Sequence, residues 1–220
     1  MSVRTRLGLS KRQEAGLVRL MQACLVGIAL AGLWDRNVRV ALNAVFALLI
    51  TQLPAILERN FRITLDVGLT LWVTAAVFLH ALGLVPFGLF GGTAYTRVWW
   101  WDHLTHTLSS TVVAAVGYTA ARVMEAQSEY NTFPSRFLFV YLLLFVMAAG
   151  VVWELVEYCI GVGSIVLGID PVLTQFGLQD TLLDLVFNTL GAVLVAAGGT
   201  AYLSGLIDQL TDRLMSRRAD

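Results

Sequence analysis

The chain has 220 residues, of which 57% are apolar and only 14% charged, and its mean hydropathy is +0.73. Soluble domains contain about a quarter charged residues, so this composition argues against a water-soluble globule and indicates an integral membrane protein. Fifteen basic and fifteen acidic residues cancel, which leaves no basic face for nucleic acid. The two cysteines, Cys24 and Cys159, form neither a disulfide framework nor a metal-binding module.

Six runs of apolar residues are long enough to cross the hydrocarbon core of a bilayer, which takes a helix of about 20 residues. In chain order they span approximately residues 18–34, 38–57, 63–86, 102–123, 136–159 and 180–203. Short polar segments separate them, and neither a sustained strand-like alternation nor an internal repeat is present. The sequence therefore predicts a single all-α domain, a polytopic membrane protein built as a bundle of about six transmembrane helices.

The distribution of Lys and Arg predicts the orientation, because cytoplasmic loops retain positive charge. Twelve of the 15 lie in the two terminal segments and in the second and fourth loops, whereas the other loops hold only Arg36, Arg39 and Arg97. We therefore expect a multi-pass protein of the plasma or inner membrane. Both termini, the tail of residues 1–16 and the amphipathic tail of residues 204–220, would be cytoplasmic.

Two segments leave alternatives open. Ala29-Leu30-Ala31 has the form of a signal-peptide cleavage site, although cleavage there would leave the orientation of the other five helices unchanged. The second segment is the C-terminal tail, where apolar residues form a helical stripe that indicates a helix lying on the membrane surface or a continuation of the sixth helix. The stripe consists of Leu203, Leu206, Ile207, Leu210 and Leu214.

Ionisable residues inside membrane helices cost about 2.5–3.5 kcal/mol each on insertion scales, so each is a functional candidate. Here they form three groups, one in each of the last three helices. These are Asp102, His103 and His106; Glu154 and Glu157; and Asp180 and Asp184, followed by Asn188. The predicted helix directions bring all three groups, and His80, to one depth near the outer face.

Helical periodicity predicts that each group forms one polar stripe. Asp102, His106, Ser109 and Ser110 share a face with His103 at its edge, Glu154 and Glu157 lie 60° apart, and Asp180, Asp184, Asn188 and Gly191 share a face. Gly191 would let a neighbouring helix approach closely. Three inward-facing stripes would form one pocket of carboxylates and imidazoles.

The excess of acidic over basic side chains in this pocket predicts a bound cation or shared protons. Five carboxylates face a single nearby permanent cation, Arg97, so they must either share protons or surround a metal. Mixed oxygen and imidazole ligands suit Zn, Mn or Fe, and a carboxylate-dominated subset suits Mg. The candidate metal ligands are Asp102, His106, Glu154, Asp180 and Asp184, and the candidate catalytic bases are Glu157 and His103.

Simpler interpretations exist for single residues. Asp102 and Asp180 at helix starts could be helix caps, but Glu154 and Glu157 near a helix C-terminus could not, because the dipole there disfavours acids. His80 is more simply a hydrogen-bonded interfacial histidine than a ligand. Asp66 is interpreted as an ion-pair partner of the arginines before it, Arg59 and Arg62.

The motifs Asp102-x-x-x-His106, Glu154-x-x-Glu157 and Gln179-Asp180-x-x-x-Asp184 with Gly191 resemble those of the YjdF-like (DUF2238) inner-membrane proteins. A looser likeness to the VanZ-like family rests on Asp184, Asn188 and Gly191. The resemblance covers about residues 60–200, and Tyr158 departs from the tryptophan common in the YjdF-like group. It implies a polytopic membrane fold with these residues as its shared core, and the VanZ-like side hints at the cell envelope, but it brings no established reaction.

Three functions are compatible with these features. The first is a metal-dependent hydrolase or transferase that acts on a lipid or lipid-linked headgroup at the outer surface, with membrane lipids as its partners. The second is a transporter or channel subunit in which the same carboxylates bind a proton or cation. The third is a structural or assembly protein whose polar cluster stabilises the bundle. The sequence does not determine the substrate, the metal or the oligomeric state.

Overall fold

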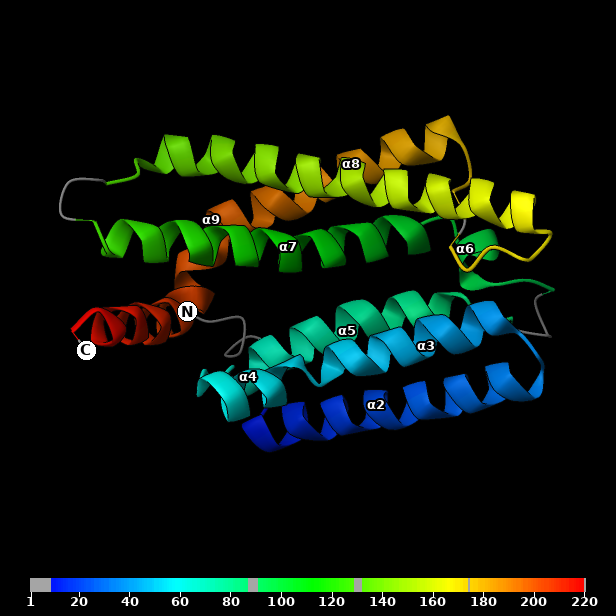
Figure 1. Ribbon diagram of the computed structural model, residues 1–220, viewed down its shortest axis with the longest axis horizontal. Helices are drawn as coiled ribbons and strands as arrows, with labels where there is room; N and C mark the ends of the chain where they lie inside the picture. The colour runs from blue at the N-terminus through cyan, green and yellow to red at the C-terminus, as the bar shows by residue number, and fades with distance from the viewer. Residues whose placement is uncertain (1–8, 87–90, 129–131, 174, 220) are drawn as a thin grey trace.

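The computed structural model describes residues 9–86, 91–128, 132–173 and 175–219. The described residues form helices joined by turns, with no β-strand among them, which confirms the all-α prediction (Figure 1). The helices are α2 (Lys11–Trp34), α3 (Val38–Thr51), α4 (Leu53–Phe61), α5 (Val67–Gly83), α6 (Ala94–Arg97), α7 (Trp101–Ala126), α8 (Ser135–Leu167) and α9 (Leu178–Ala219).

Short polar side chains begin three of these helices. Ser10 forms a capping box with Gln13 at the start of α2, and Asn37 accepts a hydrogen bond from the backbone N–H of Val40 at the start of α3. Asp66 caps α5 by accepting a hydrogen bond of 3.0 Å from the backbone N–H of Leu69. Asp66 therefore serves as a helix cap. The sequence had instead suggested that it is an ion-pair partner of Arg59 and Arg62.

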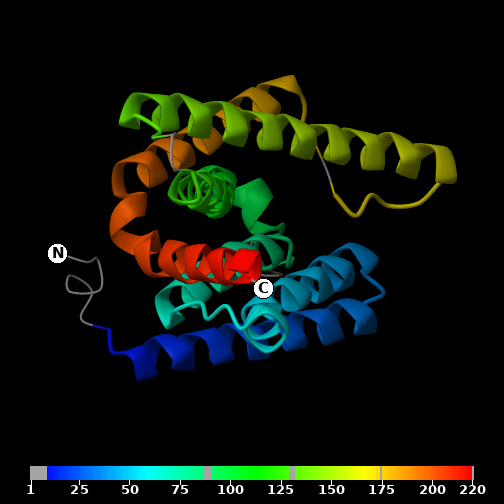
Figure 2. The same ribbon diagram turned by 60° about the vertical axis from the view of Figure 1, so that its left-hand side comes forward.

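The helices form two layers (Figures 1 and 2). In one layer α2, α3 and α5 pack together around Leu25, Ala47 and Ala81. In the other, α7 packs most extensively on α9, and α8 covers both, around a core that includes Tyr118 and Leu142. The layers are joined through α5 and α7, so α7 lies near the centre of the molecule in Figure 2.

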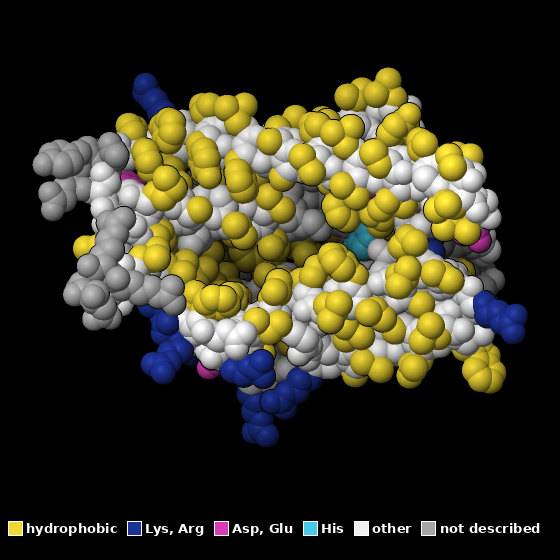
Figure 3. All heavy atoms as spheres, in the orientation of Figure 1, with side chains coloured by type: hydrophobic (Ala, Val, Ile, Leu, Met, Phe, Trp, Pro, Cys, Tyr) yellow, Lys and Arg dark blue, Asp and Glu magenta, His cyan; other side chains and the backbone are white. Residues whose placement is uncertain are grey.

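Four segments are long and apolar enough to cross a membrane by length and composition: Lys11–Trp34, Val38–Phe61, Ser135–Leu167 and Leu178–Gly199. The apolar α5 is shorter, at 17 residues, and the 26-residue α7 contains the polar side chains of the candidate site. Large hydrophobic side chains spread over the face in Figure 3, as a lipid-facing surface requires. The chain is therefore a helical multi-pass membrane protein, and the count of six spans stays a prediction.

Two helices differ from the predicted spans in ways that shape the bundle. Pro54, in the first turn of α4, has no backbone N–H, so the predicted run 38–57 is divided at Gln52 into α3 and α4. Helix α8 continues beyond residue 159, through two glycines, and ends at Gly168, whose φ of +66° is the left-handed conformation typical of a helix end.

The C-terminal tail is part of α9, which runs for 42 residues. Leu203 is buried and Ile207 packs on the same core cluster. The Gln209 side chain accepts a hydrogen bond of 3.0 Å from the backbone N–H of Thr64 and donates one of 3.2 Å to its carbonyl oxygen. The tail is thus continuous with α9, which changes direction before its C-terminal part (Figures 1 and 2), and its apolar stripe packs on the protein.

Candidate metal centre

Polar side chains from six helices, α3 and α5 to α9, meet at one end of a cavity of about 780 Å³. Five of the seven predicted site residues line it: Asp102, His106, Glu157, Asp180 and Asp184. They come from the start of α7, the second half of α8 and the start of α9. The structure therefore brings these five side chains together, but the prediction that Glu157 lies near the end of its helix is wrong, because α8 continues to Leu167.

Asp102, His106 and Asp184 form the tightest group. The Nε2 atom of His106 lies 3.5 Å from Oδ1 of Asp102, one turn earlier on α7, and 3.6 Å from Oδ1 of Asp184 on α9. Each of the three residues offers a ligand atom, and these atoms lie within 4.8 Å of one another. Asp184 is only 2% exposed, and its Oδ1 has no hydrogen-bond partner among the described residues.

Small residues allow this approach of α7 and α9. A Cβ atom added to Gly191 would lie 2.7 Å from the carbonyl oxygen of Thr107 and 3.0 Å from the backbone nitrogen of Thr111, both on α7. Gly150 has the same role on α8, where an added Cβ would lie 2.8 Å from the side-chain nitrogen of Asn188. The predicted close approach at Gly191 is confirmed, and it sets the distance between His106 and Asp184.

Two further carboxylates flank the group. Asp180 accepts a hydrogen bond of 3.3 Å from the backbone N–H of Phe176, and Glu157 accepts one of 3.1 Å from the indole N–H of Trp153. Asp184 interacts electrostatically with the other four predicted carboxylates: Asp102, Asp180, Glu154 and Glu157. Four of the five carboxyl groups predicted from the sequence therefore gather at one end of the cavity, and Glu154 lies near them.

Glu154 and His103 do not line the cavity. Glu154 is 5% exposed between α8 and α9, where its Oε2 accepts a hydrogen bond of 2.8 Å from the hydroxyl of Thr181. The ring of His103 stacks on Phe187 with centroids 4.2 Å apart and lies edge-on to Trp99. Both side chains therefore face α9 rather than the cavity, which helical spacing along a single helix did not reveal.

His80 has hydrogen bonds at both ring nitrogens. The Asn43 amide donates to the carbonyl oxygens of Arg39 and Val172, at 2.8 and 3.1 Å, which turns its own oxygen toward Nε2 of His80, 3.3 Å away. The other ring nitrogen, Nδ1, lies 2.8 Å from the hydroxyl of Tyr95. Burial raises the pKa of the Tyr95 phenol above its usual range, so this hydroxyl stays protonated, and it donates a hydrogen bond of 3.3 Å to Oγ1 of Thr105. The interpretation of His80 as a hydrogen-bonded histidine is confirmed.

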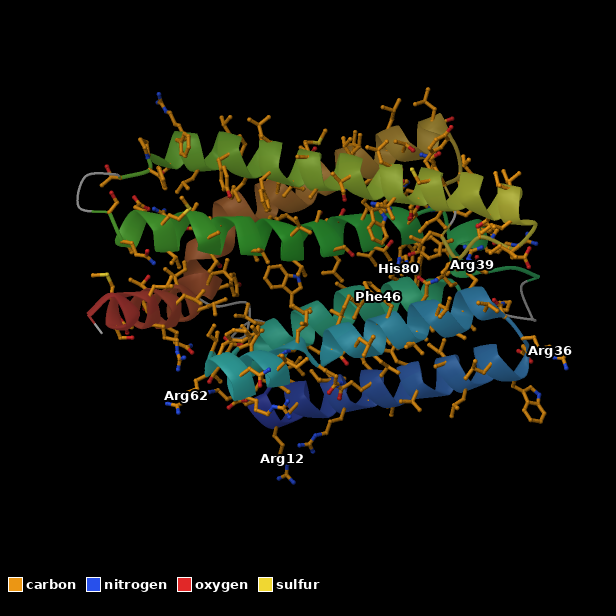
Figure 4. All side chains as sticks on the ribbon, in the orientation of Figure 1. Arg12, Arg36, Arg39, Phe46, Arg62 and His80 are labelled. Atoms are coloured by element: carbon orange, nitrogen blue, oxygen red, sulfur yellow. The ribbon has the colours of Figure 1, made fainter. Side chains whose placement is uncertain are left out.

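Arg39 lines the cavity, although the sequence suggested only a loop charge. Figure 4 shows Arg36 directed away from the molecule and Arg39 on the side of α3 toward His80, with which it interacts electrostatically. The Arg39 guanidinium interacts electrostatically with Tyr95 and Glu157, and its Nε atom has no hydrogen-bond partner among the described residues. Arg39 lies in the first turn of α3, one turn before Asn43, so the two side chains share a face of the helix. This spacing is visible in the sequence but did not enter the prediction of the site.

The rest of the cavity is apolar. Away from the carboxylates its lining includes Phe46 and Ile50 of α3, Val73 and Val77 of α5, and Val146 of α8. Figure 3 shows a hollow between the two helix layers, with hydrophobic side chains along it and a histidine at one end. The cavity thus combines a charged end with a long hydrocarbon-like remainder.

Comparisons with known proteins identify the family. The profile of the family described as "Predicted membrane protein (DUF2238)" matches residues 17–205. An uncharacterised protein of Thermotoga maritima is 30% identical over 131 residues, which cover 57% of this chain and 58% of that relative. No solved structure matches the chain, and the looser likeness to VanZ-like proteins stays a prediction. Because the profile spans most of the sequence, including every candidate site residue, the chain belongs to the DUF2238 family of predicted membrane proteins.

Proposed function

We propose that this protein is a membrane-embedded, metal-dependent hydrolase or transferase that acts on a lipid or lipid-linked headgroup. One observation carries the proposal: the ligand atoms of Asp102, His106 and Asp184 lie within 4.8 Å of one another at the charged end of an otherwise apolar cavity. The distribution of Lys and Arg supports a site near the outer face of the plasma or inner membrane.

The chemistry of the donors fits a divalent metal. Two carboxylates and one imidazole make a three-ligand set like that of catalytic zinc sites, which keep further positions open for water or substrate. Mn and Fe accept the same donors, and Asp180 adds a neighbouring carboxylate that would also suit Mg. Asp184, buried and without a hydrogen bond at Oδ1, is costly as an anion unless a cation pairs with it.

The residues of the chain then divide into ligands and a base. A bound metal would polarise the scissile group and lower the pKa of a coordinated water toward 7. Glu157 lines the cavity with its carboxylate held by the Trp153 indole, so it is our choice for the general base that takes the proton of the attacking nucleophile. His103, the other predicted base, is the weaker choice because it stacks on Phe187 outside the cavity lining.

A proton- or cation-coupled transporter is the second candidate, because the clustered carboxylates could also bind a transported cation. Conduction requires polar groups on both sides of such a site. The remainder of the cavity is lined largely by valine, leucine, isoleucine and phenylalanine, which favours the enzyme. A structural or assembly role is the third candidate, and it predicts that loss of the cluster lowers stability without removing any activity.

The first experiment is elemental analysis of the detergent-purified protein beside two variants, His106→Ala and Asp184→Asn. The exposed Asp170, in the turn between α8 and α9, provides the matched control Asp170→Asn. We expect one metal ion per chain in the wild type and the control, and its loss in both site variants with unchanged far-UV circular dichroism. The same four proteins are then incubated with membrane lipid extract, with and without a chelator, and products are followed by mass spectrometry.

Two results would reject the metal-dependent enzyme. In the first, metal-free protein still releases product from lipid. In the second, no metal is bound, and cation flux into liposomes is lost in Asp184→Asn but kept in Asp170→Asn, which would identify a transporter. Folded site variants that lose only thermal stability would identify the structural role.

A further inference from the structure

The cavity opens sideways between the two layers of helices. On one side its lining includes Leu42 and Phe46 of α3, which are 48% and 57% exposed, and on the other Val156 of α8, which is 40% exposed. Residues that both line a cavity and remain exposed mark its mouth. Figure 3 looks into this mouth from the side of the bundle, the side that meets lipid in a membrane protein whose helices cross the bilayer.

A mouth in this position favours a hydrocarbon chain as the occupant. The surface around it is apolar: Leu49 of α3 and Val152 of α8 are 63% and 59% exposed. A lipid chain would pass from bilayer to cavity without leaving an apolar environment, whereas a small polar solute would have to cross hydrocarbon first. The apolar lining beyond the mouth, which includes Ile50, Val77 and Val146, continues the same environment inside.

The charged end favours an anionic headgroup. Of the described residues that line the cavity, Arg39 alone has a permanent positive charge. A guanidinium presents several N–H donors in a planar fork that matches phosphate oxygens, and the Nε of Arg39 has no hydrogen-bond partner among the described residues. A phosphate between Arg39 and a metal held by Asp102, His106 and Asp184 would be attracted by positive charge on both sides. A quaternary ammonium group in the same place would be repelled.

We propose that the substrate is a phosphate-bearing lipid that enters between α3 and α8, with one hydrocarbon chain along the apolar part of the cavity and its phosphate on Arg39. This inference rests on the proposed function, because it names the substrate class of the same site. Arg39 would be a specificity-determining residue for the headgroup, and the Phe46–Ile50 turn of α3 would form one wall of the chain channel.

The test uses three soluble probes titrated into the protein in phosphatidylcholine nanodiscs, with empty nanodiscs as the reference. Inorganic phosphate presents the head alone, octyl phosphate the head and a chain, and octyltrimethylammonium the same chain with a cationic head. We expect octyl phosphate to bind at least ten-fold more tightly than either other probe. Shortening its chain should weaken binding by up to about four-fold per methylene group, the limit set by full burial.

Two matched pairs of variants assign the head and the chain. Arg39→Gln should weaken octyl phosphate binding at least ten-fold, whereas Arg36→Gln, at a fully outward-facing arginine of the same end, should not. Ala149→Phe fills the cavity lining and should remove the dependence on chain length, whereas Ala148→Phe, at the exposed neighbouring position of α8, should keep it. The chain-length series in the wild type keeps the chain assignment testable if Ala149→Phe does not fold.

The inference is overturned if inorganic phosphate and octyl phosphate bind alike, or if Arg39→Gln binds octyl phosphate as the wild type does. Its failure is separable from that of the proposed function, because metal content is measured on the same samples. Bound metal and lipid turnover without any effect of Arg39→Gln reject the substrate assignment alone. Octyl phosphate binding that needs Arg39 in a protein without metal rejects the enzyme and keeps the lipid-phosphate site.

Discussion

Replacing Gly191 with alanine puts a methyl group where α7 and α9 are closest. The added carbon would lie 2.7 Å from the carbonyl oxygen of Thr107 and 3.0 Å from the backbone nitrogen of Thr111. Both are backbone atoms of a helix, so neither can rotate away as a flexible side chain would. The two helices must therefore separate by several tenths of an ångström at this level.

The size of the effect follows from two opposing contributions. Overpacking a tight contact typically costs about 1–3 kcal/mol, while replacing a helical glycine with alanine gains about 0.5–1 kcal/mol from backbone entropy. Gly205, also in α9, has nothing within 4 Å of an added Cβ. Gly205→Ala therefore gains the same backbone entropy without overpacking a contact. We therefore expect Gly191→Ala to be about 1–3 kcal/mol less stable than Gly205→Ala.

The assay is titration of micelle-solubilised protein with sodium dodecyl sulfate, followed by far-UV circular dichroism. Metal affinity gives a second reading, because separating α7 from α9 also moves His106 away from Asp184. Equal free energies of unfolding for Gly191→Ala and Gly205→Ala would refute the close contact of α7 and α9, and with it the basis of the ligand geometry. Reduced stability with unchanged metal affinity would refute only the link from that contact to the metal.

Two further variants test contacts outside the metal centre. Thr181→Val removes the 2.8 Å hydrogen bond to the buried carboxylate of Glu154. The variant should be about 1–3 kcal/mol less stable than the wild type in the same titration. A variant as stable as the wild type would mean that Glu154 has another partner. Gln209→Ala removes the two hydrogen bonds to the backbone of Thr64, worth about 1 kcal/mol, and should speed amide exchange in the last turns of α9 about five-fold. The neighbouring exposed variant Asp208→Ala is the control, and equal exchange in the two would show that the tail is held by its apolar contacts alone.

Much of the candidate site was predictable because helical geometry is local. The four-residue spacings of Asp102 with His106 and of Asp180 with Asp184 put each pair on one face of its helix, and all four side chains line the cavity. Gly191 was recognisable as a point of close approach for the same reason. The alternation of helix directions then brought the polar ends to one level of the bundle.

The remaining members of the site depend on contacts between helices. Periodicity placed His103 at the edge of the polar face, but the ring of Phe187 on α9 takes it out of the cavity. Arg39 and Asn43 appeared unremarkable in the sequence, yet α3 brings them to His80 across about 40 residues of chain. Spacing along one helix does not reveal which neighbour that helix will meet.

The sequence by itself determined that this is a helical membrane protein with a concentrated group of acids and histidines, because composition and the 3.6-residue period are properties of each segment alone. Only the tertiary structure decided which ligands meet, as Asp102 and His106 do with Asp184, and that the C-terminal stripe packs on the protein. It also decided that the charged end adjoins an apolar cavity with a mouth between α3 and α8. These features arise from the packing of helices distant in sequence, which depends on the shapes of both partners at once.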